Sequence, residues 1–185
     1  QLAVTNGHFE LASALLDAGA DPNAIGAGYT TLHIISWVRK PGLGDNNPAP
    51  QGSGNMSSLD LVRKLVAKGA NVNARDFKGA TPLVVAANMN YSEGVDLLLA
   101  RGARVDESSD TGETPLITAV HNRNIAMMRA LLKAGADPDR ADNSGRSARD
   151  YALLDGKGSS LMTEIENNAK PKNPAGKPKS YGPVL

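Results

Sequence analysis

The feature that most constrains this chain is a repeated pattern in which an apolar run is followed by a glycine and a short polar turn. The four copies are LLDAGADPNA (15–24), LVAKGANVNA (65–74), LLARGARVDE (98–107) and LLKAGADPDR (131–140). Gly69, Gly102 and Gly135 are spaced 33 residues apart, whereas 50 residues separate Gly19 from Gly69. A fixed period of this length is typical of proteins built from stacked supersecondary units. The repeat therefore limits the fold more than composition does.

A second motif follows each copy and predicts where helices begin. It reads GYTTLHII (28–35), GATPLVVA (79–86), GETPLITA (112–119) and, in a degraded form, GRSARDYA (145–152). Thr81 and Thr114 are residue types that cap helix N-termini, and Pro82 and Pro115 suit the first helical position. The glycine after each apolar run suits the end of a helix. Each unit is thus predicted to be a turn, a helix, a loop and a second helix, and helices this short must stack to be stable.

The period, the TPL motif and the GADPN, GANVN and GADPD runs resemble ankyrin repeats. The resemblance covers residues 1–168 and implies an all-α solenoid of helix-turn-helix units, about five in number, with the first truncated. The last unit is expected to be a degraded C-terminal cap, because Ala148 replaces the proline and Arg149 replaces a usually buried leucine. The outer face of such a cap meets water. The histidine that usually follows the TPL motif in this family is kept only as His33.

The segment RKPGLGDNNPAPQGSGNMSS, residues 39–58, interrupts the period. The run at 30–38 before it is a first helix of a unit, and the run at 59–73 after it is a second helix. A domain linker would be followed by a new first helix, so we predict about 18 extra residues in a loop within the second repeat. The stretch 56–58 is expected to cap the helix that follows. Two interpretations of the insertion stay open, a neutral surface loop and a recognition loop.

Charge divides the chain into two parts, although the net charge is only +1. The predicted Pro/Lys-rich tail at 169–185 carries +4, which leaves −3 on the predicted solenoid at 1–168. We expect the tail to dock on an acidic surface of this chain or of a neighbour, and a plain spacer is the alternative. The overall charge gives no case for nucleic acid, and no apolar run reaches the roughly 18 residues that span a membrane. Because the sequence begins QLAVTNGHFE, we also expect sequence upstream of it.

The sequence offers no catalytic, metal or cofactor site. Without cysteine, disulfides and zinc–thiolate centres are excluded. The family resemblance implies structural roles for His8 and His33, and His121 has no second histidine at metal-ligand spacing. No nucleophile elbow, phosphate-binding glycine loop or HExxH motif is present. We therefore expect no enzymatic activity, and we expect Met128 in the core with Met127 partly exposed.

The resemblance implies a concave surface, made of the turns and the first helices, that recognises another protein. The residues that map onto it are Tyr29, Trp37, Phe77, Lys78, Asn88, Met89, Asp110, Thr111, Glu113, His121, Asn122, Asn143, Ser144 and Arg146. Trp37 and Phe77 are the expected anchors, because large aromatic residues at such positions often carry binding energy. For Trp37, packing beneath the inserted segment is the alternative.

Three hypotheses for function follow. The first is a non-catalytic protein–protein interaction module that binds through the groove and turn tips, with the insertion and tail as extra contacts. The second is a structural or decorating subunit of a larger assembly, and the third is the repeat portion of a longer enzyme. The Trp-x-Arg-x-Pro-x-x-Gly start of the insertion also resembles ankyrin proteins of environmental bacteria, some of them exported.

Overall fold

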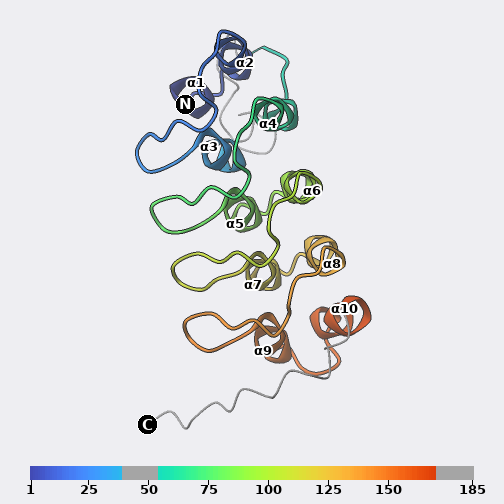
Figure 1. Cartoon of the computed structure of the whole chain (residues 1–185). Coiled ribbons are helices and arrows are strands. Elements are labelled where there is room, and N and C mark those ends of the chain that lie inside the picture. The colour runs from blue at the N-terminus through green and yellow to red at the C-terminus, as the bar shows by residue number, and fades with distance from the viewer. Residues whose placement is uncertain (39–53, 170–185) are drawn as a thin grey trace.

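The computed structural model describes residues 1–38 and 54–169, which form a stack of helix pairs. The pairs are α1 (Leu2–Thr5) with α2 (Phe9–Asp17), α3 (Thr31–Trp37) with α4 (Ser58–Ala67), α5 (Pro82–Asn88) with α6 (Ser92–Ala100), α7 (Pro115–His121) with α8 (Ile125–Lys133), and α9 (Ala148–Leu153) with α10 (Ser160–Asn168). Figure 1 shows two columns, the odd-numbered front helices and the even-numbered back helices, with the turns projecting beside the front helices. Within the described ranges the only bridges are isolated ones, so the fold is an all-α solenoid.

The front helices begin where the TPL motif predicts. Thr81 caps α5 by accepting a hydrogen bond from the backbone N–H of Val84, and Thr114 caps α7 in the same way. A proline occupies the first turn of both helices, where no N–H is needed. In α9, Ser147 and Asp150 cap each other's backbone, so this helix begins without a proline.

The back helices end in the predicted glycine motif, as α4 illustrates. Gly69 adopts φ +90°, a left-handed conformation that glycine reaches without a steric penalty. The N–H of Gly69 donates to Val66 O, and the N–H of Ala70 donates to Leu65 O. This pair of bonds satisfies carbonyls at the helix end and turns the chain toward the next repeat.

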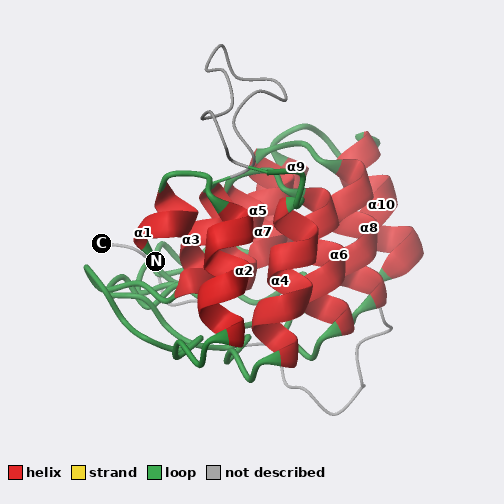
Figure 2. Cartoon of the chain, turned by 90° about the horizontal axis from the view of Figure 1, so that it is seen from above, coloured by secondary structure: helices red, strands yellow, loops and turns green. Residues whose placement is uncertain are grey.

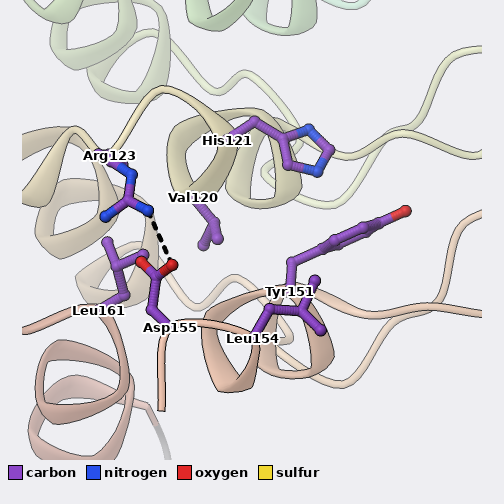
Figure 3. Close-up of a pocket in the computed structure, with 7 residues that line it drawn as sticks. All are labelled: Val120, His121, Arg123, Tyr151, Leu154, Asp155 and Leu161. Carbon is purple, nitrogen blue, oxygen red and sulfur yellow. Dashed lines mark hydrogen bonds and ion pairs between the residues drawn. The ribbon is translucent and has the colours of Figure 1, made fainter. Parts of the chain in front are cut away.

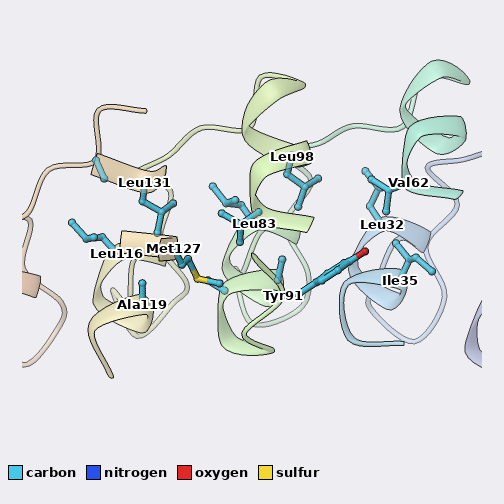
Figure 4. Packing of buried hydrophobic residues seen from close by; sticks show 14 of the residues in the cluster. Leu32, Ile35, Val62, Leu83, Tyr91, Leu98, Leu116, Ala119, Met127 and Leu131 are labelled. Atoms are coloured by element: carbon cyan, nitrogen blue, oxygen red, sulfur yellow. The ribbon is translucent and has the colours of Figure 1, made fainter. Parts of the chain in front are cut away.

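The core is an aliphatic layer between the two helix columns, as Figure 4 shows for Leu83, Leu98, Leu116 and Leu131. It continues from repeat to repeat without a break. The expectation for Met127 was wrong, because Met127 is buried like Met128. Met127 occupies the position of Leu61 in α4, where a back helix packs against the preceding one, so this position is not free to face solvent.

The predicted insertion lies between α3 and α4. Ser57 caps α4 by accepting from the N–H of Asp60, and the N–H of Asn55 donates to Glu10 Oε1 at 2.7 Å. The second repeat is therefore resumed at its back helix. Residues 39–53 of the predicted insertion and residues 170–185 of the predicted tail lie outside the described residues.

Asparagine side chains join consecutive repeats at the turns that follow the back helices in the chain. Asn23 Nδ2 donates to Gly69 O at 2.8 Å, while Asn23 Oδ1 accepts from Asn71 N at 2.7 Å. Asn73 makes the equivalent pair of bonds to Gly102 O and Arg104 N. Each amide thus ties one repeat to the next with both its donor and its acceptor.

Candidate protein-binding surface

The turns beside the front helices are bonded to one another through their backbones. Phe77 N donates to Gly28 O, Asp110 N donates to Lys78 O, and Asn143 N donates to Thr111 O, at 2.9 to 3.1 Å. Figures 1 and 2 show these turns gathered on one side of the helix stack. Because the backbone groups already have partners, the side chains are what the turns present to solvent. We call the turns at 25–29, 76–80, 109–113 and 142–146, with the exposed side of α3, α5, α7 and α9, the front surface.

Three aromatic rings meet at the N-terminal end of the front surface. The ring of Tyr29 lies 4.7 Å from that of Trp37 and 5.0 Å from that of Phe77, edge-to-face in both cases. Phe77 remains 59% exposed, and Lys78 Nζ lies 5.5 Å from its ring centre. We call Tyr29, Trp37 and Phe77 the aromatic cluster. Edge-to-face contacts between aromatic rings are favourable, so the three rings hold one another in place.

Local structure explains how these rings come together. Ala27 and Gly28 have φ of +52° and +84°, and Gly26 pairs with Tyr29 across them. Two successive positive φ angles make a tight turn, which leaves Tyr29 immediately before α3. Trp37 lies at the last turn of α3, and helical side chains lean toward the N-terminus. Its indole therefore reaches back over Tyr29 and packs on the cluster of Ala80, Val84 and Val85 in the next repeat.

Side chains of successive front helices are paired across the repeat boundaries. In each pair, the seventh residue after the cap of one front helix contacts the fourth residue after the cap of the next front helix. Trp37 packs against the cluster that contains Val85, Thr118 Oγ1 donates to Asn88 Oδ1 at 3.1 Å, and the rings of His121 and Tyr151 lie 4.4 Å apart. The pairs change from apolar to polar to mixed aromatic along the stack, so the two ends of the front surface differ chemically.

The C-terminal end of the front surface combines charge with aromatic rings. His121 Nδ1 lies 3.5 Å from Glu113 Oε1, and Tyr151 donates its hydroxyl hydrogen to Asp142 Oδ2 at 2.7 Å. Burial alone would raise the pKa of Asp142, but the hydrogen bonds from Ser144 and Tyr151 outweigh it and hold that pKa below its usual value. The guanidinium of Arg146 lies 5.9 Å from the ring centre of Tyr151. This carboxylate is therefore kept charged as part of the turn.

Next to this group is a small pocket between α7 and α9, shown in Figure 3. The residues that line it are Val120, His121, Arg123, Tyr151, Leu154, Asp155 and Leu161. An ion pair of 2.7 Å joins Arg123 to Asp155 at its edge. The pocket has a volume of about 170 Å³, below the roughly 300–1,000 Å³ of typical small-molecule sites. Its size suits one side chain of a bound protein better than a metabolite.

The residues predicted from the sequence are divided between these groups. Tyr29, Trp37, Phe77 and Lys78 lie together at one end, and Glu113, His121 and Arg146 lie at the other. The remaining predicted residues are exposed on the same front surface: Asn88, Met89, Asp110, Thr111, Asn122, Asn143 and Ser144.

Some of these exposed residues also hold the repeats together. Asn122 Nδ2 donates to Ala87 O, and Asn143 Nδ2 donates to Asp110 O. Their amides are therefore committed to contacts between neighbouring repeats.

Sequence reasoning missed Tyr151 and Leu154. Both lie in α9 or at its end, in the repeat whose motif is degraded. Counting four and seven residues from the cap Ser147, as Thr118 and His121 are counted from Thr114, would have placed them on the front surface. This repeat lacks the TPL motif, which marks the caps of α5 and α7, so the sequence contained no such signal for the cap of α9.

Neither a metal centre nor a membrane span is found among the residues that the structure describes. Within 1–38 and 54–169, no group of three or more His, Asp or Glu residues is placed to hold a metal ion. In the same ranges no helix is both long and apolar enough to cross a bilayer.

Stacked helix pairs with bonded turns define an α-solenoid repeat protein that exposes a long front surface. Comparison with protein families identifies the kind of repeat: a model of three ankyrin repeats matches residues 53–142, and a model of a single ankyrin repeat matches residues 1–27. The two matches cover more than half of the chain, which belongs to the ankyrin repeat family. Ankyrin repeats generally mediate protein–protein interaction, and proteins built from them are typically non-enzymatic. A comparison with curated proteins found no match.

Proposed function

We propose that this chain is a non-catalytic protein–protein interaction module that binds its partner along the front surface. The aromatic cluster is the main anchor in this proposal. The group around His121 and Tyr151 supplies polar contacts at the other end. The insertion and the Lys-rich tail are proposed to add further contacts beyond the described residues.

The observation that carries the proposal is the exposure of Phe77 within a cluster that is already ordered. A phenylalanine that packs on Tyr29 at one edge and remains 59% exposed leaves apolar area for a partner to bury. Apolar area removed from water contributes about 25 cal/mol per Å². Aromatic residues at such sites dominate binding energy more often than their share of the contact area would indicate.

Preorganisation strengthens this interpretation. The ring contacts and the backbone bond from Phe77 N to Gly28 O hold the cluster before any partner arrives. Ordering a side chain on binding costs about 0.5–1.5 kcal/mol, so a surface that is ordered beforehand avoids part of that cost.

The change in chemistry along the surface favours a partner with an apolar side chain at one end of its contact and polar groups at the other, and with acidic groups beside the cation at each end. Lys78 and Arg146 carry cations beside the rings of Phe77 and Tyr151. Both are exposed, and they are therefore available to a partner's carboxylates.

Capture from an extract of the native source tests the proposal. The full chain is immobilised next to the double variant Trp37→Ala/Phe77→Ala and a control variant, Leu153→Ser, whose leucine is exposed on the capping repeat. We expect one set of proteins to be retained by the wild-type chain and the control and lost by the double variant. Circular dichroism must first show that all three chains fold alike. Equal retention by the double variant would contradict binding through the aromatic cluster.

A further inference from the structure

The pocket between α7 and α9 lies where, one repeat earlier, an asparagine side chain joins two front helices. Asn122 Nδ2 donates to Ala87 O at 3.0 Å, which places its amide at the end of α5. Counted from the helix caps, Asp155 stands at the position of Asn122. As a carboxylate it cannot donate to Val120 O, the counterpart of Ala87 O, and it accepts from Arg123 instead, at 2.7 Å. The joining amide is thus missing at this junction, and a recess lined by Val120 and Asp155 remains (Figure 3).

The connection between α9 and α10 is a second difference between the two junctions. It comprises residues 154–159, whereas residues 122–124 connect α7 to α8. Leu154 begins this longer connection and is 71% exposed. Val120 and Leu161 also line the pocket and are only 3% exposed. The pocket therefore has buried apolar groups and one exposed apolar wall to offer to a ligand.

The charges beside the pocket favour an acidic ligand. Arg123 donates one hydrogen bond to Asp155, and its side chain is 69% exposed. A guanidinium has several N–H donors, so Arg123 keeps donors for a second carboxylate. Arg146 is exposed and lies 5.9 Å from the ring centre of Tyr151, another lining residue. The acids nearby already accept hydrogen bonds, from Arg123 in the case of Asp155, from Tyr151 in the case of Asp142 and from Thr118 in the case of Glu113.

We propose that this pocket takes a leucine or isoleucine side chain of the partner, and that an acidic residue next to it in the partner binds Arg123. The inference rests on the proposed function, because a partner that follows the front surface passes the pocket. The volume of about 170 Å³ and the apolar lining suit one branched aliphatic side chain. Charge complementarity carries the choice of an acidic neighbour, since a lysine or arginine there would face Arg123 with like charge.

Titration with capped tripeptides, followed by NMR of the full chain, tests this site without the partner. The probe acetyl-Glu-Leu-Glu-amide has a carboxylate on each side of its leucine, and we expect it to shift the backbone resonances of Arg123, Leu154 and Asp155 to saturation. Acetyl-Glu-Ala-Glu-amide should bind at least about tenfold more weakly, because an apolar pocket discriminates by about that factor per methylene group. Acetyl-Gln-Leu-Gln-amide should bind about threefold more weakly, as expected for the loss of an exposed ion pair.

Variants of the chain assign the binding to the pocket. Leu154→Ala removes the exposed wall and Arg123→Gln removes the cation, so each should weaken the binding of the first probe. The matched controls, Leu153→Ala and Arg101→Gln, change residues that do not line the pocket and should leave the binding unchanged. Shifts that do not saturate, or a probe affinity that both pocket variants retain, would overturn the proposal. Shifts of the same resonances that depend on protein concentration without any probe would assign the pocket to a second copy of the chain and would overturn it too.

Failure of this inference can be told apart from failure of the proposed function, because the aromatic cluster lies at the other end of the front surface. The Trp37→Ala/Phe77→Ala chain should bind the tripeptide as the wild-type chain does. If a partner is captured through the aromatic cluster and the tripeptide does not bind, only the assignment of the pocket is wrong. If the tripeptide binds and the double variant still captures the same proteins, the pocket stands and the role of the aromatic cluster is wrong.

Discussion

Asp106 occupies the position at which asparagines tie earlier repeats together. Its carboxylate accepts from Asp137 N at 3.0 Å, but it has no hydrogen to donate to Gly135 O as Asn23 donates to Gly69 O. Burial raises the pKa of Asp106. The hydrogen bond from Asp137 N lowers that pKa, and the negative charge of Asp137 raises it further. The junction between the fourth and fifth repeats is therefore the one at which an acid replaces the joining amide.

We predict that Asp106→Asn stabilises the chain at pH 7. The new amide can donate to Gly135 O, and a hydrogen bond of this kind contributes about 0.5–1.5 kcal/mol. Asn73→Asp, the reverse change at the preceding junction, should destabilise the chain by a similar amount. Urea denaturation of the three chains checks both signs. No gain in the midpoint for Asp106→Asn would contradict the role assigned to this position.

The same substitution has a predicted pH dependence. Folding raises the pKa of Asp106 above its unfolded value of about 3.9. The stability that Asp106 contributes is therefore complete below that unfolded pKa and is lost as the pH rises through the pKa of Asp106 in the folded chain. The advantage of Asp106→Asn should thus be largest at neutral pH and should shrink in acid. A pH-independent difference between the two chains in urea would count against this linkage.

His33 is a second residue whose charge state is coupled to the fold. Its Nδ1 accepts from Thr30 N, and its Nε2 lies 3.0 Å from Ala80 O, so the neutral ring satisfies both contacts. Burial lowers the pKa of His33 more than the bond to Ala80 O and the charge of Asp76 raise it.

We predict that His33→Gln costs about 1–3 kcal/mol at pH 7.5, because it removes buried hydrogen bonds. With the folded pKa lowered, the contribution of His33 is present above the unfolded value of 6.5 and is lost as the pH falls below it. The stability difference between the two chains should therefore narrow between pH 7.5 and pH 5.5. Chemical denaturation at both pH values measures it, and a constant difference would argue that His33 is not held neutral.

At the scale of elements, the first turn differs from the others. The turns at 76–80 and 142–146 are held by an aspartate side chain that accepts from two backbone N–H groups of its own turn. The turn at 26–29 has instead two residues of positive φ, one of which is Ala27.

We predict that Ala27→Gly stabilises this turn. A left-handed backbone costs a residue with a side chain about 1–2 kcal/mol, and Ala27→Gly removes this cost. The greater freedom of glycine in the unfolded chain offsets part of the resulting gain in stability. A net gain of about 0.5–1 kcal/mol in thermal or urea unfolding is expected. Ala80→Gly, in a turn without that strain, serves as the control and should not stabilise the chain.

The front helices and their caps could be predicted because each depends on a local signal. The TPL motif sets the cap and the first turn by itself. Tyr151 was missed because Ser147 and Asp150 achieve the same cap with different residues. The environment of Met127 depends on the neighbouring repeat, and the contact between Tyr29 and Trp37 depends on how far an indole leans along α3. Such contacts between elements are not encoded in the period alone.

At the scale of the whole molecule, the front surface has two ends of different chemistry on one continuous stack. The aromatic cluster belongs to the second and third repeats, and the group around His121 and Tyr151 belongs to the fourth and fifth. Because the repeats share one uninterrupted core, the two ends are held at a fixed separation. A partner that contacts both ends would be selected by spacing as well as by chemistry.

We propose that the aromatic cluster carries most of the binding energy for that partner. The most direct measurement is a calorimetric titration of the captured partner against the full chain and three variants. Phe77→Ala and Trp37→Ala remove the anchors, and Leu153→Ser serves as the control. Anchor residues typically contribute about 2 kcal/mol or more, so each alanine variant should bind at least about 30-fold more weakly, with the control unchanged. Affinities equal to that of the wild-type chain in both alanine variants, with the fold intact, would show that the aromatic cluster does not carry the binding.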